Sequence, residues 1–68
     1  MSEHILQFFA YEHLPERLQG VSRPFGELAK EIADNLPRNP ERTAALCKLL
    51  EAKDAAVRAF LARDATND

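Results

Sequence analysis

The sequence has little of what usually stabilises a very small domain. Its 68 residues include one cysteine, Cys47, so no disulfide can form within the chain. Neither His4 nor His13 stands at zinc-ligand spacing from that cysteine, and we expect no metal and no cofactor. A chain of this length buries only roughly 60% of its unfolded surface, so an isolated core is marginal. We therefore expect further copies of the same chain to supply the missing stability.

The sequence also lacks an excess of positive charge and a long apolar run. Nine basic and 11 acidic residues give a net charge of -2, which argues against DNA binding through many phosphate contacts. A small anion held by one or two arginines is compatible with this charge. No apolar run approaches the ~20 residues of a membrane span, and Ser2, Glu3 and His4 do not resemble the positive start of a signal peptide. We expect a soluble, intracellular protein with no membrane association.

Glycine and β-branched residues are scarce, whereas alanine and leucine are plentiful, and this composition favours helices. The clearest helical segment runs from about Pro40 to Arg63. Asn39 can cap it, and Pro40 suits the first helical position. A helix of this length would be roughly 35 Å long, which 68 residues folded on themselves do not cover.

A second helix is expected from about Arg23 to Asn35, with Ser22 as its N-cap and Pro24 in its first turn. Lys30 and Asp34 would form an i,i+4 ion pair on it. Its apolar residues recur at helical spacing and lie at Phe25, Leu28, Ala29, Ile32, Ala33 and Leu36. The predicted fold class is all-α: a short N-terminal arm or helix, then an antiparallel αα-hairpin, assembled as a homo-oligomer.

The whole chain, residues 1–68, is predicted to be one helical-hairpin domain. Its parts are an N-terminal arm (1–21), the hairpin (22–63) and a polar, frayed tail (64–68). Within the arm, Pro15 disfavours helix at Leu14, and a short helix is expected from Pro15 to about Gln19 or Gly20. Leu36–Asn39 is the expected break between the two long helices.

Aromatic residues are concentrated in the arm, where Phe8, Phe9 and Tyr11 lie together. Core packing is the ordinary explanation for the two phenylalanines. Tyr11 combines a flat ring with a polar tip, so it is either structural or a platform on which a nucleobase stacks. Arg23, at the expected helix start, is either a solvated surface arginine or an anion clamp that adds to the free N–H groups of a helix N-terminus.

No arrangement of a nucleophile with a base, no glycine-rich phosphate loop and no paired carboxylate motif is visible, so we expect no enzyme activity. Cys47 is interpreted as a buried or half-buried small apolar residue. Arg58 lies four residues after Asp54, and an i,i+4 ion pair is its default explanation. The other possibility for Arg58 is a place in an assembly interface.

Three longer motifs occur in this order along the chain. They are FxYxHLP at Phe9–Pro15, SRPF at Ser22–Phe25 and LLEAKDxxVR at Leu49–Arg58. Their combination resembles the phage cyclic-oligonucleotide sponges that defeat CBASS immunity and share a hairpin domain with some anti-Thoeris sponges. The resemblance covers about Phe8 to Leu61.

The resemblance implies a function of sequestration. In CBASS, an infected bacterium makes cyclic nucleotides that activate lethal effectors, and the sponge binds these messengers without cleaving them in the cytoplasm of the infected host. Family members are helical and assemble as hexamers. Cyclic dinucleotides such as cyclic GMP-AMP bind in pockets shared by two protomers, and some members hold cyclic trinucleotides in a separate pocket made by three.

The resemblance also implies roles for individual residues. Tyr11 matches the arm tyrosine that stacks on the base. Arg23 matches the basic residue that binds the phosphate, with Lys30 as the second choice. Gly26 is an alternative match for that position, which would be a departure from the family pattern. Arg58 matches the arginine of the trinucleotide pocket.

Two function classes therefore remain in view. In the first, two copies of Tyr11 and two of Arg23 meet at a two-fold interface and match the approximate symmetry of a cyclic dinucleotide. In the second, the chain is a small helical protein–protein interaction module or regulator with no nucleotide ligand. DNA recognition is disfavoured, because no helix rich in arginine, asparagine or glutamine is evident.

Overall fold

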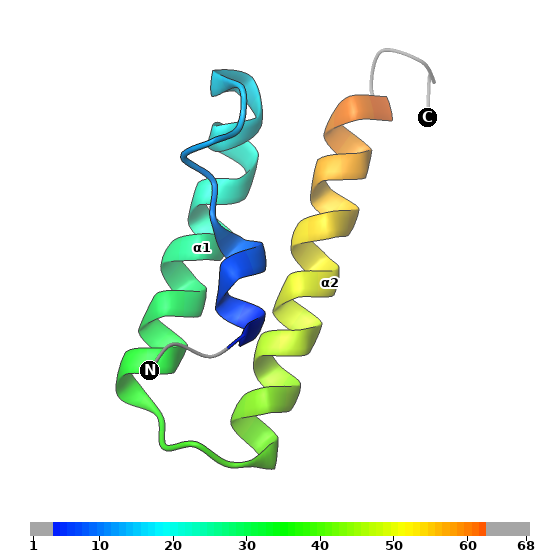
Figure 1. Ribbon diagram of the computed structural model, residues 1–68. Coiled ribbons are helices and arrows are strands. Elements are labelled where there is room, and N and C mark those ends of the chain that lie inside the picture. The colour runs from blue at the N-terminus through cyan, green and yellow to red at the C-terminus, as the bar shows by residue number, and fades with distance from the viewer. Residues whose placement is uncertain (1–3, 63–68) are drawn as a thin grey trace.

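The computed structural model describes residues 4–62, and all regular secondary structure in this part of the chain is helical, as predicted (Figure 1). A 3₁₀-helix η1 (His4–Phe9) is followed by α1 (Glu16–Asn35) and α2 (Pro40–Ala62). The long helices form the predicted antiparallel hairpin. The predicted tail and Arg63 lie outside the described residues. No helix within 4–62 is long and apolar enough to cross a bilayer.

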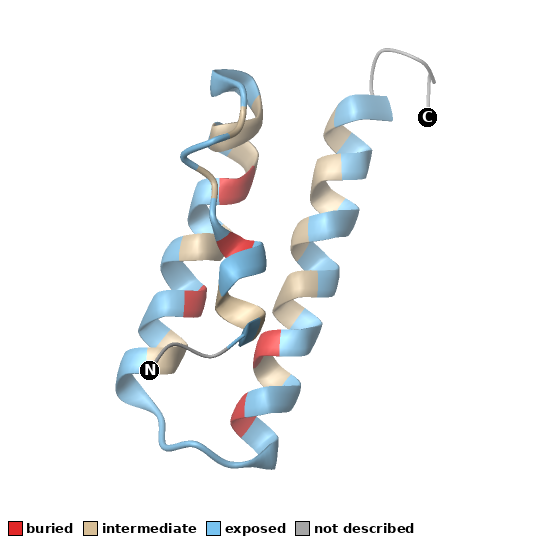
Figure 2. Ribbon diagram, viewed as in Figure 1, coloured by how far each residue is buried: buried red, intermediate tan, exposed pale blue. Residues whose placement is uncertain are grey.

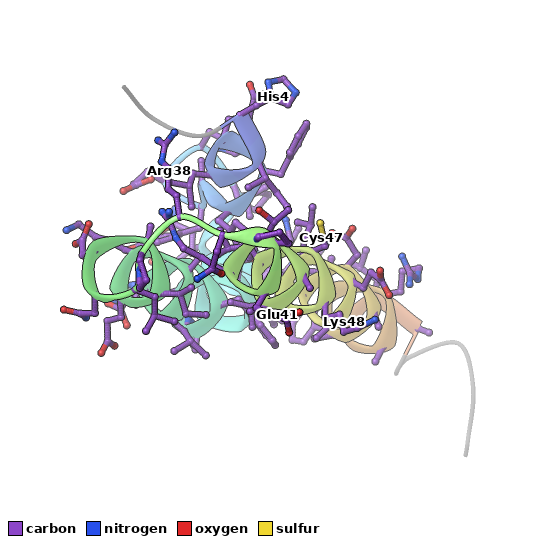
Figure 3. The ribbon with its side chains drawn as sticks, turned by 90° about the horizontal axis from the view of Figure 1, so that it is seen from below. His4, Arg38, Glu41, Cys47 and Lys48 are labelled. Atoms are coloured by element: carbon purple, nitrogen blue, oxygen red, sulfur yellow. The ribbon has the colours of Figure 1, made fainter. Side chains whose placement is uncertain are left out.

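The 3₁₀-helix η1 packs against both long helices and closes one side of the hairpin. Viewed from below, the three elements form a triangle with η1 above the line joining α1 and α2 (Figure 3). One buried side chain from each element, Phe9, Ala29 and Leu46, makes the core at the centre of this triangle. The half-buried apolar residues around it are Ile5, Leu6, Phe25, Ile32, Leu49 and Leu50.

Helix α1 is continuous across Pro24, and the predicted helix start at Ser22 is wrong. The segment from Pro15 to Gly20, predicted as a separate short helix, forms the first turns of α1 instead. Pro15 precedes the helix, and Ser22 lies inside it with 1% of its surface exposed. Arg23 is consequently in the middle of a helix and not at its N-terminus.

Packing explains why the proline does not end the helix. Pro24 leaves only the carbonyl of Gly20 without its helical donor, and both residues are exposed, so water can satisfy that carbonyl. The inward face continues through the proline at i, i+4, i+7 and i+11, namely Leu18, Ser22, Phe25 and Ala29. Burial along this face outweighs the local preference of Pro24 for a helix start.

Helix α2 begins as predicted. The Asn39 side-chain Oδ1 accepts a hydrogen bond of 2.8 Å from the backbone N–H of Arg42, and Pro40 occupies the first helical position. Arg42 itself is 6% exposed, and its Nη2 donates to the Ala33 carbonyl oxygen of α1 at 3.2 Å. This bond places a cation near the C-terminal end of α1, where the helix dipole is favourable, and joins the two helices beside their connection.

Several large apolar residues are exposed, including Phe8, for which core packing was the ordinary explanation. Phe8 is 48% exposed, Leu28 46%, Leu36 49% and Leu61 50%. Cys47 is also exposed, so its assignment as a buried or half-buried residue is wrong. Helix α2 carries buried residues only in its N-terminal part, at Arg42 and Leu46 (Figure 2). Within the described residues, the C-terminal half of α2 therefore has little to pack against.

Leu46 is fully buried at the centre of the core, and Cys47 beside it is exposed. We expect Leu46→Ala to lower the free energy of unfolding by about 2–5 kcal/mol, because it removes apolar contacts and leaves a cavity. Cys47→Ala should change it by less than about 0.5 kcal/mol. Urea unfolding followed by circular dichroism at one protein concentration measures both. Equal effects of the two substitutions would contradict the assigned core.

Candidate ligand-binding site

The aromatic arm approaches α1 most closely at Gly26. A Cβ atom at this position would lie 2.8 Å from the Phe9 carbonyl oxygen and 2.9 and 3.0 Å from Cδ1 and Cε1 of Tyr11. These distances are shorter than real Cβ contacts, so only glycine fits here without a shift of the arm. The half-buried Tyr11 ring therefore rests on the backbone of α1.

Arg23 lies beside the same ring. Its guanidinium carbon is 5.5 Å from the centroid of Tyr11, which is a cation–π contact. Arg23 and Gly26 are three residues apart and so share one face of α1. Arg23 was expected to add to a helix N-terminus, and that part of the hypothesis is wrong. Arg23 contacts Tyr11 from the side of a continuous helix instead.

Hydrogen bonds hold the arm on both sides of Tyr11. After it, Gln19 Nε2 donates to the carbonyl oxygens of Leu14 at 2.8 Å and Glu12 at 3.3 Å. Before it, Lys53 Nζ of α2 donates to the Phe8 carbonyl oxygen at 2.6 Å. These contacts fix the backbone that carries Tyr11 relative to both long helices.

The cluster formed by Tyr11, Arg23 and Gly26 combines two chemical capacities. An aromatic ring offers a surface for stacking a planar base, and an exposed guanidinium offers paired donors for a phosphate. Gly26 supplies no side chain of its own, and its role is to let the ring lie close to the helix. The arrangement suits a small ligand that presents a base and a phosphate a few ångströms apart.

Lys30 and Arg58 do not join this cluster. Lys30 Nζ donates to Asp34 Oδ2 at 2.8 Å, which confirms the predicted i,i+4 pair, and this hydrogen bond raises the pKa of the lysine. Arg58 is exposed on α2. Within residues 4–62, the ion pair of Asp54 is with Lys53 at 3.5 Å, so the expected pairing of Arg58 with Asp54 is wrong.

The sequence reading overlooked Lys53 and Gln19. A signal for Lys53 was present, because it interrupts an apolar stripe of α2 that is otherwise formed by Leu46, Leu49, Leu50, Val57 and Phe60. A lysine at such a position reaches over the core with its stem and places its charge at the edge. No comparable signal exists for Gln19, because it does not interrupt the inward face of α1 that Leu18, Ser22, Phe25 and Ala29 form.

Other known proteins add nothing to this picture. The chain matches no protein-family model, no curated protein and no solved structure. Within the described part of the chain, no three histidine, cysteine, aspartate or glutamate side chains are grouped so that they could hold a metal ion. The geometry around Tyr11 is therefore the structural basis for assigning the site.

Gly26 and Gly20 provide a matched pair of substitutions on α1. Gly26→Ala should destabilise the protein by about 1–2 kcal/mol, because the clash with the arm exceeds the gain in helix propensity. Gly20→Ala should stabilise it by about 0.5–1 kcal/mol, since a Cβ there meets nothing within 4 Å.

Tyr11 reports on the same contact, because it is the single tyrosine in a chain without tryptophan. Gly26→Ala should make its fluorescence more accessible to acrylamide and weaken its near-UV circular dichroism. Gly20→Ala should change neither signal. An undisturbed tyrosine signal in Gly26→Ala would show that the arm does not rest on α1 at this point.

Proposed function

We propose that this chain binds and sequesters cyclic dinucleotides without cleaving them, and so blocks CBASS signalling in the cytoplasm of an infected bacterium. As in some sponges of the family it resembles, cyclic trinucleotides would bind at a second site that includes Arg58. Two independent lines support the proposal. One is the combination of motifs between Phe9 and Arg58, and the other is the contact of Tyr11 with Arg23 and Gly26.

The contact between Tyr11 and Arg23 is the observation that carries the proposal. The resemblance implies Tyr11 for the base and Arg23 as the first choice for the phosphate, and the two residues lie side by side on the folded chain. The guanidinium is exposed and the ring is half-buried, so both remain accessible to a ligand. Lys30 is the weaker candidate for the phosphate, because Asp34 already accepts a hydrogen bond from its ammonium group.

The shape of the protomer supports a site completed by a second copy. The radius of gyration is 13.2 Å, against ~11 Å for a compact domain of this length. Among residues 4–62, only Phe9, Ala29 and Leu46 form the buried apolar core, while leucines of both long helices stay exposed. A two-fold arrangement of copies would cover apolar surface and present Tyr11 and Arg23 twice, once for each nucleotide of the ligand.

The chemistry of these residues supports binding without cleavage. Tyr11 offers a surface for stacking, and Arg23 offers paired donors for a phosphate. A cyclic dinucleotide incubated with the protein should therefore be recovered intact after heat denaturation. Chromatography that detects linear or hydrolysed nucleotide would support an enzyme in place of a sponge.

Substitution at the site tests the proposal directly. We expect Tyr11→Ala to weaken cyclic dinucleotide binding by about tenfold to a hundredfold per base, because stacking contributes ~1–3 kcal/mol. Tyr11→Phe should retain most of the affinity. Arg23→Met should cost about tenfold or more, since it removes a charged hydrogen-bond donor. Arg17→Met, which removes the same charge from another exposed position of α1, is the control.

Isothermal titration calorimetry against a panel of cyclic di- and trinucleotides measures these affinities, and sedimentation records the assembly in parallel. Tyr11→Ala should leave the assembly intact. If the Tyr11→Ala variant dissociates into single chains, Tyr11 is structural. If the unaltered protein shows no binding to any nucleotide of the panel, the sponge hypothesis is wrong.

The alternative function, a helical protein–protein interaction module, is favoured by one observation. Leu28 and Leu61 are large apolar side chains, one on each long helix, and about half of each is exposed. If the purified protein sediments as a single chain and binds no cyclic nucleotide, these surfaces belong to a different partner and this alternative holds.

A further inference from the structure

We propose that Lys53 is a positioning residue for the binding site: it fixes the arm so that the Tyr11 ring stays on α1. The effect on ligand affinity depends on the function proposed above, whereas the effect on the position of Tyr11 does not. Lys53 lies on α2, where its Nζ contacts the Phe8 carbonyl oxygen and the carboxylate of Asp54. It therefore acts on the site through the arm backbone.

The surroundings of Lys53 differ from those of a solvated surface lysine. Only 14% of its side chain is exposed, compared with 49% for neighbouring Asp54. Its Nζ donates to the Phe8 carbonyl oxygen at 2.6 Å, and Asp54 Oδ1 lies 3.5 Å away. The hydrogen bond itself lies at the exposed edge of the protein, and its charged donor makes it stronger than a bond between two neutral groups.

The accepting carbonyl lies at the end of η1. The last carbonyls of a helix have no partner within it, and a cation there is favourable both as a donor and as a charge. The next carbonyl, that of Phe9, faces α1 at Gly26. Successive residues of the arm are thus tied to the two long helices, Phe8 to α2 by a hydrogen bond and Phe9 to α1 by close packing.

The position of Tyr11 follows from this arrangement. Lys53 holds the backbone three residues before the tyrosine, and Gln19 holds Leu14 three residues after it. The contact at Gly26 is van der Waals packing and has little directionality. Without the Lys53 bond, the arm can slide along α1 and carry the ring away from Arg23.

Lys48 provides a matched control on the same helix. It is exposed and points to the face of the hairpin opposite η1 (Figure 3). Lys48→Met and Lys53→Met remove the same charge from α2 and add the same side chain. Lys53→Arg retains a cation with donors that can reach the Phe8 carbonyl.

The experiment measures acrylamide quenching of Tyr11 fluorescence, helix content and cyclic dinucleotide affinity for all three variants. Lys53→Met should increase the quenching by about twofold and weaken the affinity by about tenfold, at unchanged helix content. Lys53→Arg should restore most of both properties. Lys48→Met should match the unaltered protein in each measurement.

The outcomes separate the two proposals. Unchanged quenching and affinity in Lys53→Met would overturn the role of Lys53, as would a Lys53→Arg variant that restores neither. If the unaltered protein binds no cyclic nucleotide, the proposed function fails, and the quenching of Tyr11 still decides the role of Lys53. Should Lys53→Met lose helix content, Lys53→Gln, a neutral residue that keeps a donor, takes its place with the same expected direction.

Discussion

The close approach of the N-terminal arm to α1 at Gly26 is the constraint on which the rest of the structure depends. A side chain at this position would collide with the Phe9 carbonyl oxygen and the Tyr11 ring. The approach brings Phe9 into contact with Ala29 and Leu46, so that all three elements share one small core. It also sets the ring of Tyr11 next to Arg23. One missing side chain thus links the stability of the fold to the geometry of the candidate site.

Around this contact, the polar bonds fix an arm that has few apolar anchors. Lys53 binds the arm from α2 and Gln19 binds it from α1, and both donate to backbone carbonyls. Such bonds depend on the path of the backbone, so they fix the arm in one register, which apolar packing alone does not do. This support matters for binding a ligand, because a loosely held tyrosine ring would lose conformational entropy on binding and so lower the affinity.

The apolar surface that the single chain leaves exposed is the surface that the proposed assembly of copies would cover. The hairpin is elongated, its core is confined to the region beside η1, and the C-terminal half of α2 has no buried residue within the described part (Figure 2). If a second copy covers this surface, folding and site completion become one event. If the site exists only in the assembly, the amount of ligand that is bound would then depend on the fraction of chains that are assembled.

The sequence by itself determined the helical class, the connection at 36–39, the Asn39 cap and the Lys30–Asp34 pair, because each depends on neighbours within four residues. It also singled out Tyr11, Arg23 and Gly26, but not how they meet. Local rules predicted a helix start at Ser22. In the structure, α1 continues through Pro24, because its inward face is packed on both sides of the proline. The contact of the arm with Gly26 and the bond from Lys53 join residues far apart in sequence. Only the tertiary structure decided them, because packing brings those backbone atoms together and no local preference encodes their distance.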